Sequence, residues 1–218
     1  LRRYLKVEAS DVALDIACGI GLYTNRIFRR ARLVVGMDLV WRNILMARYF
    51  RTGQTFFYQG NAEHLAHREA TFDVVISICA LEHFQDADHA LAEMYRVLKP
   101  GGRLALTVDS LGNITSPEFR QFHREFCQVV NYFSPEDIRQ RLEQAGFEVE
   151  RLDVMLSSGV SARLCVGAFR IMKWPLLFNV YSCLAYPTTL VADRLFRSPH
   201  GITIGVCARK TESIPIRN

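Results

Sequence analysis

The stretch "LDIACGIG", residues 14–21, decides the fold class of this chain. It places Asp15 within an apolar run and follows that run with Gly19 and Gly21, one on each side of a single apolar residue. A strand that turns through glycines into a helix lets its backbone approach a ligand closely, and the first amides of the helix are free to donate hydrogen bonds. We therefore expect a binding site at this turn, where the Asp15 carboxylate suits a ligand that carries a cationic amine.

Length and composition limit the classes of protein to which the chain can belong. With 218 residues, half of them hydrophobic, we expect one domain over residues 1–218. The net charge of +5 comes mainly from scattered arginines rather than from a lysine-rich block, and it suits an anionic small molecule or a membrane surface as well as RNA. Because no aromatic or basic recognition segment follows the fourth strand, we expect no nucleic-acid partner. Six widely spaced cysteines without a CxxC pair predict neither a metal site nor a disulfide framework, and they favour a cytoplasmic location. The first ten residues lack the apolar segment of a signal peptide.

Strand-like and helix-like segments alternate along the chain. Short apolar runs predict seven strands, at Val12–Ala17, Leu33–Met37, Thr55–Tyr58, Phe72–Ile78, Arg103–Val108, Phe147–Val154 and Ile202–Ala208. Helical patterns predict helices at Leu22–Arg30, Trp41–Arg51, Ala87–Leu98, Pro117–Val130 and Pro135–Ala145. This order predicts an α/β fold with a doubly wound, mostly parallel seven-stranded sheet that is covered on both faces. In such sheets, ligands bind beyond the carboxyl ends of the strands.

The ends of the second and third strands offer further polar groups. Asp38 stands where an acid can accept both ribose hydroxyls of an adenosine, although it is equally placed to cap the helix that starts at Trp41. Leu39 would supply an apolar face for adenine. In "GNAEHL", the Asn61 side-chain oxygen could accept from an adenine amino group while the Ala62 amide donates to a ring nitrogen, but alone this segment is also an ordinary turn.

Five segments in order resemble the class I S-adenosylmethionine (SAM) methyltransferases, and most of all their small-molecule and quinone-type, methyltransferase type 11-like branch. The segments are "LDIACGIG", "GMDLV", "GNAEHL", "FDVVISICALEHF" and "EMYRVLKPGGRL". The resemblance covers Val12 to Val154, and Ile202–Ala208 fits the family's antiparallel last strand. It implies a SAM-dependent methyltransferase that releases S-adenosylhomocysteine.

The resemblance also implies a set of cofactor-binding residues. Asp15, Gly19 and Gly21 would surround the methionine part of SAM, Asp38 would bind the ribose, and Asn61 with Ala62 would bind the adenine. The full implied set is Asp15, Ala17, Cys18, Gly19, Gly21, Asp38, Leu39, Asn61, Ala62, Glu63 and Cys79. Ala17 replaces the glycine of many members, which is acceptable if its backbone is ordinary β. Asn61 replaces a more usual aspartate.

His83 in "ALEHF" is the candidate catalytic base. It follows the fourth strand and therefore lies at the pocket rim, and the ordinary pKa of imidazole suits proton transfer near neutrality. The alternative is that His83 orients the loop through a backbone hydrogen bond while the enzyme acts by proximity alone. His123 is a second candidate, expected at the surface or as a capping residue.

The segment between the sixth and seventh strands, residues 157–200, is unusually long. Trp174 to Ala192 contain no charge, and cations flank this run, namely Arg163, Arg170, Lys173, Arg194 and Arg197. Pro187 and several polar residues argue against a transmembrane helix. We expect an apolar insert of one or two helices, broken around Pro187, with one apolar face formed by Leu177, Tyr181, Leu184, Thr188, Val191 and Leu195.

The insert allows three interpretations: peripheral contact with the inner membrane surface through residues 163–197, a lid over the substrate, or a homodimer interface. The first two favour a hydrophobic small-molecule acceptor, such as a lipid, a prenylated quinone-like ring or a polyketide-like phenol. Two alternatives to a methyltransferase stay open. One is a catalytically silent SAM-binding partner subunit, and the other is an NAD-type nucleotide-binding oxidoreductase, which Thr24 weakens because that fingerprint requires a third glycine there.

Overall fold

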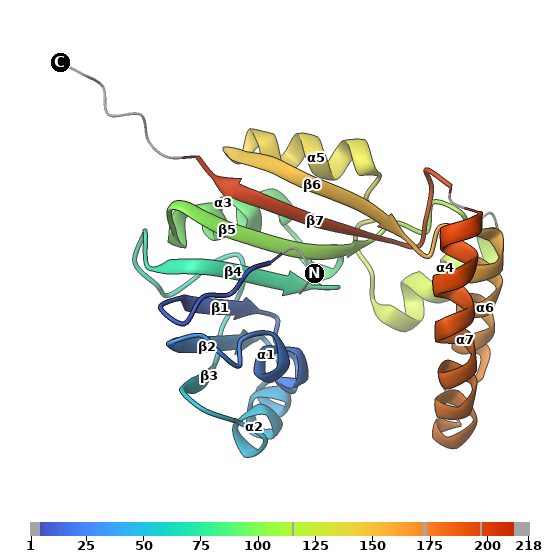
Figure 1. The fold of residues 1–218 in the computed structure, drawn as a ribbon, viewed down its shortest axis with the longest axis horizontal. Coiled ribbons are helices and arrows are strands. Elements are labelled where there is room, and N and C mark those ends of the chain that lie inside the picture. The colour runs from blue at the N-terminus through green and yellow to red at the C-terminus, as the bar shows by residue number, and fades with distance from the viewer. Residues whose placement is uncertain (1–4, 115, 172–173, 197, 212–218) are drawn as a thin grey trace.

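A single seven-stranded sheet forms the centre of the computed structural model, which describes residues 5–114, 116–171, 174–196 and 198–211 (Figure 1). The strands are β1 (Val12–Ile16), β2 (Leu33–Asp38), β3 (Thr55–Gln59), β4 (Phe72–Ile78), β5 (Leu98–Asp109), β6 (Phe147–Met155) and β7 (Thr203–Lys210). Their order across the sheet is β3-β2-β1-β4-β5-β7-β6. Strands β1 to β5 pair in parallel, and β7 runs antiparallel to both of its neighbours. The predicted fold class is confirmed.

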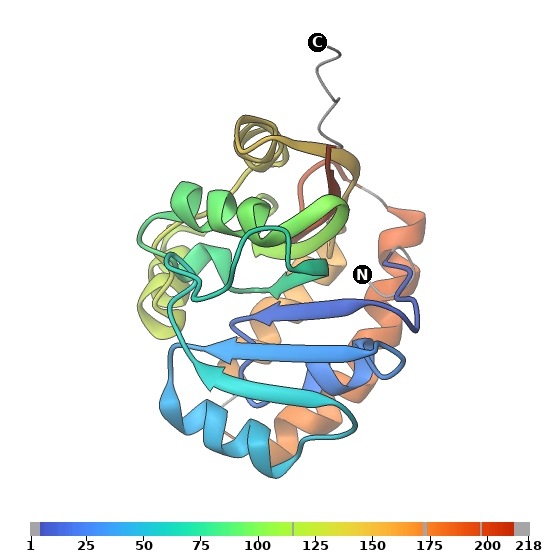
Figure 2. The same ribbon diagram turned by 90° about the vertical axis from the view of Figure 1, so that its left-hand side faces the viewer.

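Helices connect the strands much as the sequence predicts. They are α1 (Leu22–Ile27), α2 (Trp41–Tyr49), the short 3₁₀ helix η1 (Leu81–His83), α3 (Ala87–Val97), α4 (Pro117–Cys127), α5 (Pro135–Gln144), α6 (Gly159–Ile171) and α7 (Pro175–Leu195). The helices α1 to α5 end one to three residues before the predicted ends. Helices α1 and α3 lie on opposite faces of the sheet (Figure 2), so both faces are covered.

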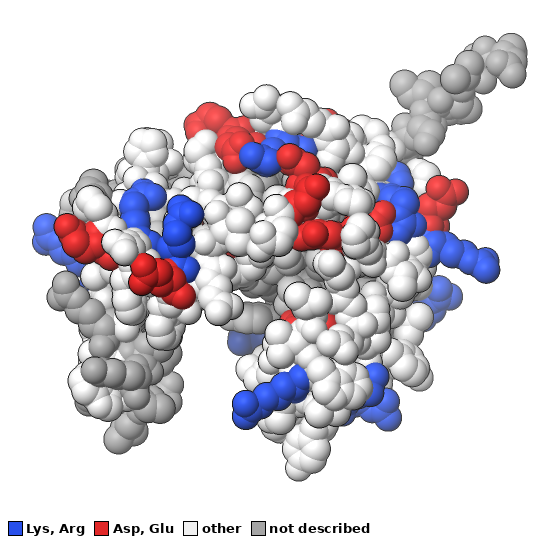
Figure 3. Space-filling view, turned by 180° about the vertical axis from the view of Figure 1, so that it is seen from behind, with Lys and Arg blue, Asp and Glu red and all other residues white. Residues whose placement is uncertain are grey.

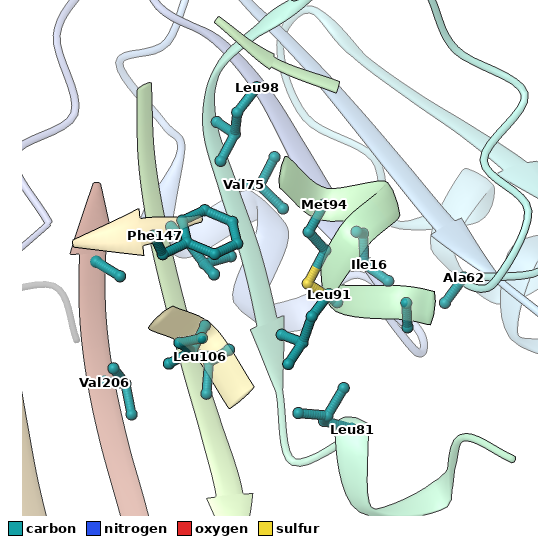
Figure 4. Packing of buried hydrophobic residues seen from close by; sticks show 14 of the residues in the cluster. Ile16, Ala62, Val75, Leu81, Leu91, Met94, Leu98, Leu106, Phe147 and Val206 are labelled. Carbon is teal, nitrogen blue, oxygen red and sulfur yellow. The ribbon is translucent and has the colours of Figure 1, made fainter. Parts of the chain in front are cut away.

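Alternation along β1 assigns its side chains to the two faces. Leu14 and Ile16 are fully buried and pack with Leu91 and Met94 of α3 in the largest core cluster (Figure 4). Because successive side chains of a strand point to opposite faces, Asp15 lies on the other face, which α1 covers. The strand therefore places one carboxyl group inside the protein at its carboxyl end.

The first four residues of "KPGGRL" lie within β5, although the sequence predicts that this strand begins at Arg103. Strand β5 starts directly after α3, and Leu98 pairs with Phe72 before Arg103 pairs with Val74. The intervening residues form a bulge that includes Gly102. A Cβ on Gly102 would lie 2.8 Å from the carbonyl oxygen of Lys99, so a side chain at this position would collide with the backbone.

Helices α6 and α7 form a projecting helical hairpin, called the arm below. Because Met155 of β6 pairs with Thr203 of β7, the arm is an insertion at the end of a β-hairpin. The predicted break at Pro187 is wrong, since α7 continues through this proline. The helical pattern is interrupted earlier, because α6 ends at Ile171 and α7 begins at Pro175. The predicted cations Lys173 and Arg197 lie outside the described residues. Within the described ranges, no helix is both long and apolar enough to cross a bilayer.

A buried polar contact joins the two ends of the arm. Asp193 of α7 accepts hydrogen bonds from the Ser158 amide at 2.9 Å and from the Ser161 hydroxyl at 2.6 Å. Ser161 is fully buried, so loss of its acceptor would leave a polar group unsatisfied in the interior. This contact holds α7 against the start of α6.

We expect Asp193→Ala to loosen the arm while leaving the sheet intact. Loss of these bonds should lower the local stability by about 1–3 kcal/mol, measured as faster hydrogen exchange in residues 159–195 with unchanged exchange in β4 and β5. The control is Asp88→Ala, which removes an exposed ion pair with Arg141 and should change little. Unchanged protection of the arm in Asp193→Ala would contradict this interpretation.

Candidate functional site

The carboxyl ends of β1 and β4 border a cavity of about 270 Å³. Its lining residues are Asp15, Ala17, Cys18, Gly19, Ile20, Leu22, Tyr23 and Ile78. Four of the predicted site residues, Asp15, Ala17, Cys18 and Gly19, are therefore brought together around one cavity. They occupy the place where the parallel sheet predicts a ligand.

The carboxyl group of Asp15 is the most deeply buried acid at this cavity, with only 2% of its surface exposed. Burial raises its pKa from the usual 3.8 to about 7, the Thr24 hydroxyl opposes this rise, and the nearby Asp38 adds to it. Thr24 donates to Asp15 Oδ2 at 2.5 Å from the first turns of α1. Thr24, which stands where the dinucleotide-binding fingerprint has its third glycine, thus holds Asp15 in place. Because this role depends on the packing of α1 against β1, the sequence did not predict it.

The loop from Ala17 to Gly21 has a left-handed backbone at three positions. Ala17 has φ = 57°, so the condition under which alanine is readily acceptable here, an ordinary β backbone, is not met. A non-glycine residue in this region carries about 1–3 kcal/mol of strain, which is typical of functional sites. The two glycines differ in role, because a Cβ on Gly19 would meet nothing within 4 Å whereas a Cβ on Gly21 would lie 2.8 Å from the Phe57 ring. Gly19 leaves space for a ligand, and Gly21 makes room for the core.

Asp38 links the loop from Ala17 to Gly21, called the glycine loop below, to the start of α2. Its Oδ2 accepts from the Gly19 amide at 2.8 Å, and its Oδ1 accepts from the Val40 amide at 2.9 Å and from Asn43 Nδ2 at 3.1 Å. The N-cap of α2 is Val40, so Asp38 supports the helix from two residues before it. Since a carboxylate offers about four acceptor positions, three protein donors leave room for about one hydrogen bond to a ligand.

The residues predicted to face adenine lie at the neighbouring strand ends. Leu39 is 65% exposed beside Asp38. Asn61 follows β3, and its Oδ1 already accepts from the Glu63 amide at 3.0 Å, which leaves one acceptor lone pair. Ala62 is buried in the main core cluster. Glu63 Oε1 accepts from the Gln85 amide, so its carboxylate ties this loop to the segment before α3 rather than standing free for a ligand.

A second group of titratable side chains lies beyond β4 and β5, and the sequence analysis found only part of it. The ligand atoms of Cys79, Glu82 and Asp109 all lie within 4.8 Å of one another. Glu82 is fully buried and its two carboxylate oxygens lack hydrogen-bond partners within the described part of the chain. Burial, with the Asp109 charge, raises the pKa of Glu82 to about 8. These atoms could accept a cation, so the expected absence of a metal site stays a prediction.

The two candidate bases are in different environments. His83 is exposed, and its Nδ1 lies 3.3 Å from the Gln128 carbonyl oxygen, which is the backbone contact that the orienting alternative expects. His123 is only 2% exposed, so its expected position at the surface is wrong. It lies between Tyr132, whose hydroxyl is 3.0 Å from His123 Nδ1, and Asp109, whose Oδ2 is 3.4 Å from His123 Nε2. Burial lowers the pKa of His123, and the nearby His83 lowers it further.

Comparison with known proteins identifies relatives with this arrangement. Residues 14–106 match the family described as a methyltransferase domain. The chain is 36% identical over 110 residues to the demethylmenaquinone methyltransferase of Lactobacillus johnsonii, covering 47% of this chain and 45% of that protein. It is 32% identical over 157 residues to O-methyltransferase rstn1 of Aspergillus nomiae, covering 68% of this chain and 70% of that protein. The chain thus spans less than half the length of the first of these relatives.

A solved structure supports the fold. The S-adenosylmethionine-dependent methyltransferase from Mesorhizobium loti matches with a TM-score of 0.69 at 17% sequence identity, over 95% of this chain and 94% of that protein. At this identity the similarity concerns the fold alone.

We expect the stability of the protein to depend on pH through Asp15. Because its pKa rises from 3.8 to about 7 on folding, the folded state binds this proton more tightly, and the resulting stabilisation is present below pH 3.8 and lost as pH rises through 7. Asp15→Asn should therefore exceed the parent in stability at pH 8, by up to about 4 kcal/mol, and should approach it near pH 4. Urea unfolding of both proteins across this pH range measures the difference in their free energies of unfolding. A difference that does not change with pH would show that the pKa of Asp15 is not raised by folding.

Proposed function

The chain belongs to the class I SAM-dependent methyltransferases of the type 11 branch, and we propose that it transfers a methyl group from SAM to a hydrophobic small molecule. The acceptor classes that we propose are a lipid, a prenylated quinone-like ring and a polyketide-like phenol. The observation that carries the proposal is the buried carboxyl group of Asp15 beside a cavity that Gly19 lines. The arm, which bears exposed apolar side chains, lies at the same edge of the sheet.

The residues around the cavity fit SAM in charge and in space. Asp15 is buried, and the one donor to its side chain within the described part of the chain is the neutral Thr24 hydroxyl, so a cationic amine in the cavity would satisfy its charge. The open space beside Gly19 admits the amino-acid part of a ligand. Asp38 keeps about one acceptor position for a ribose hydroxyl, and Leu39 offers an exposed apolar side chain beside it. SAM supplies, when bound, a methyl group on a sulfonium sulfur for in-line displacement.

The protein's task in this reaction is to align the acceptor, exclude water and, for a phenol, remove a proton. His83 lies in η1, the short helix that follows β4, and its Nδ1 is 3.3 Å from the Gln128 carbonyl oxygen. If Nδ1 carries the proton in that contact, Nε2 is the free basic nitrogen. We therefore assign proton removal from an acidic acceptor to His83 Nε2, while acceptors without an acidic proton need only alignment.

The arm supports a hydrophobic acceptor. The apolar face predicted on α7 is largely exposed: Leu184 is 69%, Val191 59% and Leu195 67% accessible to water. Figure 3 shows the surface hollowed between the arm and the part of the molecule that carries α1 and α2. Exposed apolar surface of this extent is typical of binding sites for apolar partners. A relative that acts on demethylmenaquinone agrees with such an acceptor.

We expect Asp38→Asn to weaken SAM binding by about 10-fold or more. The amide removes the charge and one acceptor oxygen, and a hydrogen bond to a charged group is worth about 1.5–3 kcal/mol. Isothermal titration calorimetry with SAM measures the change. The control is Asn43→Ala, which removes a donor to Asp38 without touching the carboxylate, and should therefore bind SAM at least as tightly as the parent. Equal affinity of Asp38→Asn and the parent would rule out this role for Asp38.

Replacing the arm separates cofactor binding from acceptor choice. Because β6 and β7 pair up to Met155 and Thr203, a short glycine-serine turn can replace residues 159–199 and close the hairpin. We expect this variant to bind SAM like the parent but to lose at least 10-fold in methyl transfer to a prenylated hydroquinone, because the apolar surface that holds the chain of the acceptor is gone.

The control acceptor for the arm variant is an unprenylated, water-soluble hydroquinone, with which both proteins should react at similar rates. Retained transfer to the prenylated acceptor would show that the arm does not bind it. Lost SAM binding would show that the arm supports the cofactor site instead.

A further inference from the structure

The surface of α2 is unusually apolar for a helix on the outside of a protein. Ile44 and Ala47 face the sheet and are fully buried, as expected for an amphipathic helix. The outer face, however, carries Trp41, Leu45 and Tyr49 at a spacing of four residues, and they are 47%, 50% and 81% exposed. This outer row would ordinarily be polar. The helix therefore presents an apolar stripe to its surroundings.

The exposed charged side chains in residues 19–62, which include α2, are all positive. Residues 19–62 contain one acid, Asp38, which is 7% exposed and bonded within the glycine loop. The same residues contain seven exposed arginines: Arg26, Arg29, Arg30, Arg32, Arg42, Arg48 and Arg51. Figure 3 shows Lys or Arg side chains at the end of the molecule that carries α2. Within the described ranges, none of the seven forms an ion pair with an acid. This surface is therefore suited to an anionic partner.

We infer that α2, with the flanking arginines, docks the protein on an anionic lipid bilayer. A helix with tryptophan, tyrosine and leucine on one face and arginines beside them is typical of segments that lie in the membrane interface. The aliphatic side chain of Leu45, in the middle of the stripe, has no hydrogen-bonding group with which to contact a nucleic-acid base, so the same surface suits lipid better than a nucleic acid. The Arg48 guanidinium lies 5.2 Å from the Trp41 ring centroid, at the edge of the stripe.

The tip of the arm lies at the same end of the molecule as α2. Figures 1 and 2 both show the start of α7 level with α2, and Trp174 at this turn is 50% exposed. One flat surface can therefore touch α2 and the arm tip together. The hollow between them would open toward the bilayer. The docking surface that we infer thus centres on α2, outside the insert to which the sequence analysis assigned membrane contact.

This inference extends the proposed function, because a bilayer across the mouth of the hollow would deliver a hydrophobic acceptor directly to the cofactor cavity. The docking itself requires neither SAM nor an acceptor. Binding to vesicles can therefore be tested alone, and its failure would leave cofactor binding and methyl transfer unaffected.

The experiment is sedimentation of the whole chain with vesicles of phosphatidylcholine, with and without phosphatidylglycerol. We expect binding only to the anionic vesicles and a decrease as salt is added. Arg42→Glu combined with Arg51→Glu should weaken binding by about 20-fold or more, since each cation near an anionic surface contributes about fivefold. Leu45→Ser combined with Tyr49→Ser should also weaken it, while SAM affinity stays at the parental value in both variants.

Two matched controls stand on other parts of the molecule. Arg139→Glu reverses a half-exposed charge on α5, and Leu195→Ser removes an exposed apolar side chain at the far end of α7. Both should bind vesicles like the parent. Equal vesicle binding by the α2 variants would overturn the inference. So would a concentration-dependent dimer that the α2 substitutions dissociate, or tight binding of single-stranded RNA without vesicle binding, because each would assign α2 a different partner.

Discussion

Two carboxyl groups at the ends of adjacent parallel strands shape the candidate site. Asp15 lies one residue before the end of β1, inside the protein, where Thr24 is the only donor to its side chain among the described residues. Asp38 ends β2, where it accepts from the Gly19 amide. The loop between the strand end and α1 is thereby fixed around a cavity, with Gly19 open to it. Burial makes the Asp15 charge costly, as its raised pKa shows, so a cationic ligand in the cavity gains more from this group than it would at the surface.

The sequence predicted the features that depend on local pattern and strand order. Alternation and the spacing of glycines located β1, the glycine loop and Asp38, because residues at the carboxyl ends of parallel strands meet at one edge. Features set by tertiary contacts were not predicted. The bond from Thr24 to Asp15 requires α1 to pack on β1, and the room that Gly21 leaves for Phe57 depends on β3. The left-handed backbone of Ala17 has no signal in residue type.

Two further errors have the same physical origin. His123 is a polar residue on an amphipathic helix, so a surface position was predicted for it. In the structure Tyr132 and Asp109 lie against its two ring nitrogens and help to bury it. Pro187 ordinarily interrupts a helix, yet α7 passes through it. The Thr188 hydroxyl donates to the Leu184 carbonyl in that turn. In both cases the prediction came from a rule for the single residue type, and the structure departs from that rule.

Transfer of a methyl group from SAM to a hydrophobic acceptor must leave the methyl group in a lipophilic product. The first measurement incubates the purified protein with methyl-labelled SAM and a total cell extract, and then divides the products between organic solvent and water. We expect label in the organic phase, and Asp38→Asn should reduce it. Label confined to the aqueous phase would contradict a hydrophobic acceptor, and the absence of transfer despite SAM binding would indicate a silent binding subunit instead of an enzyme.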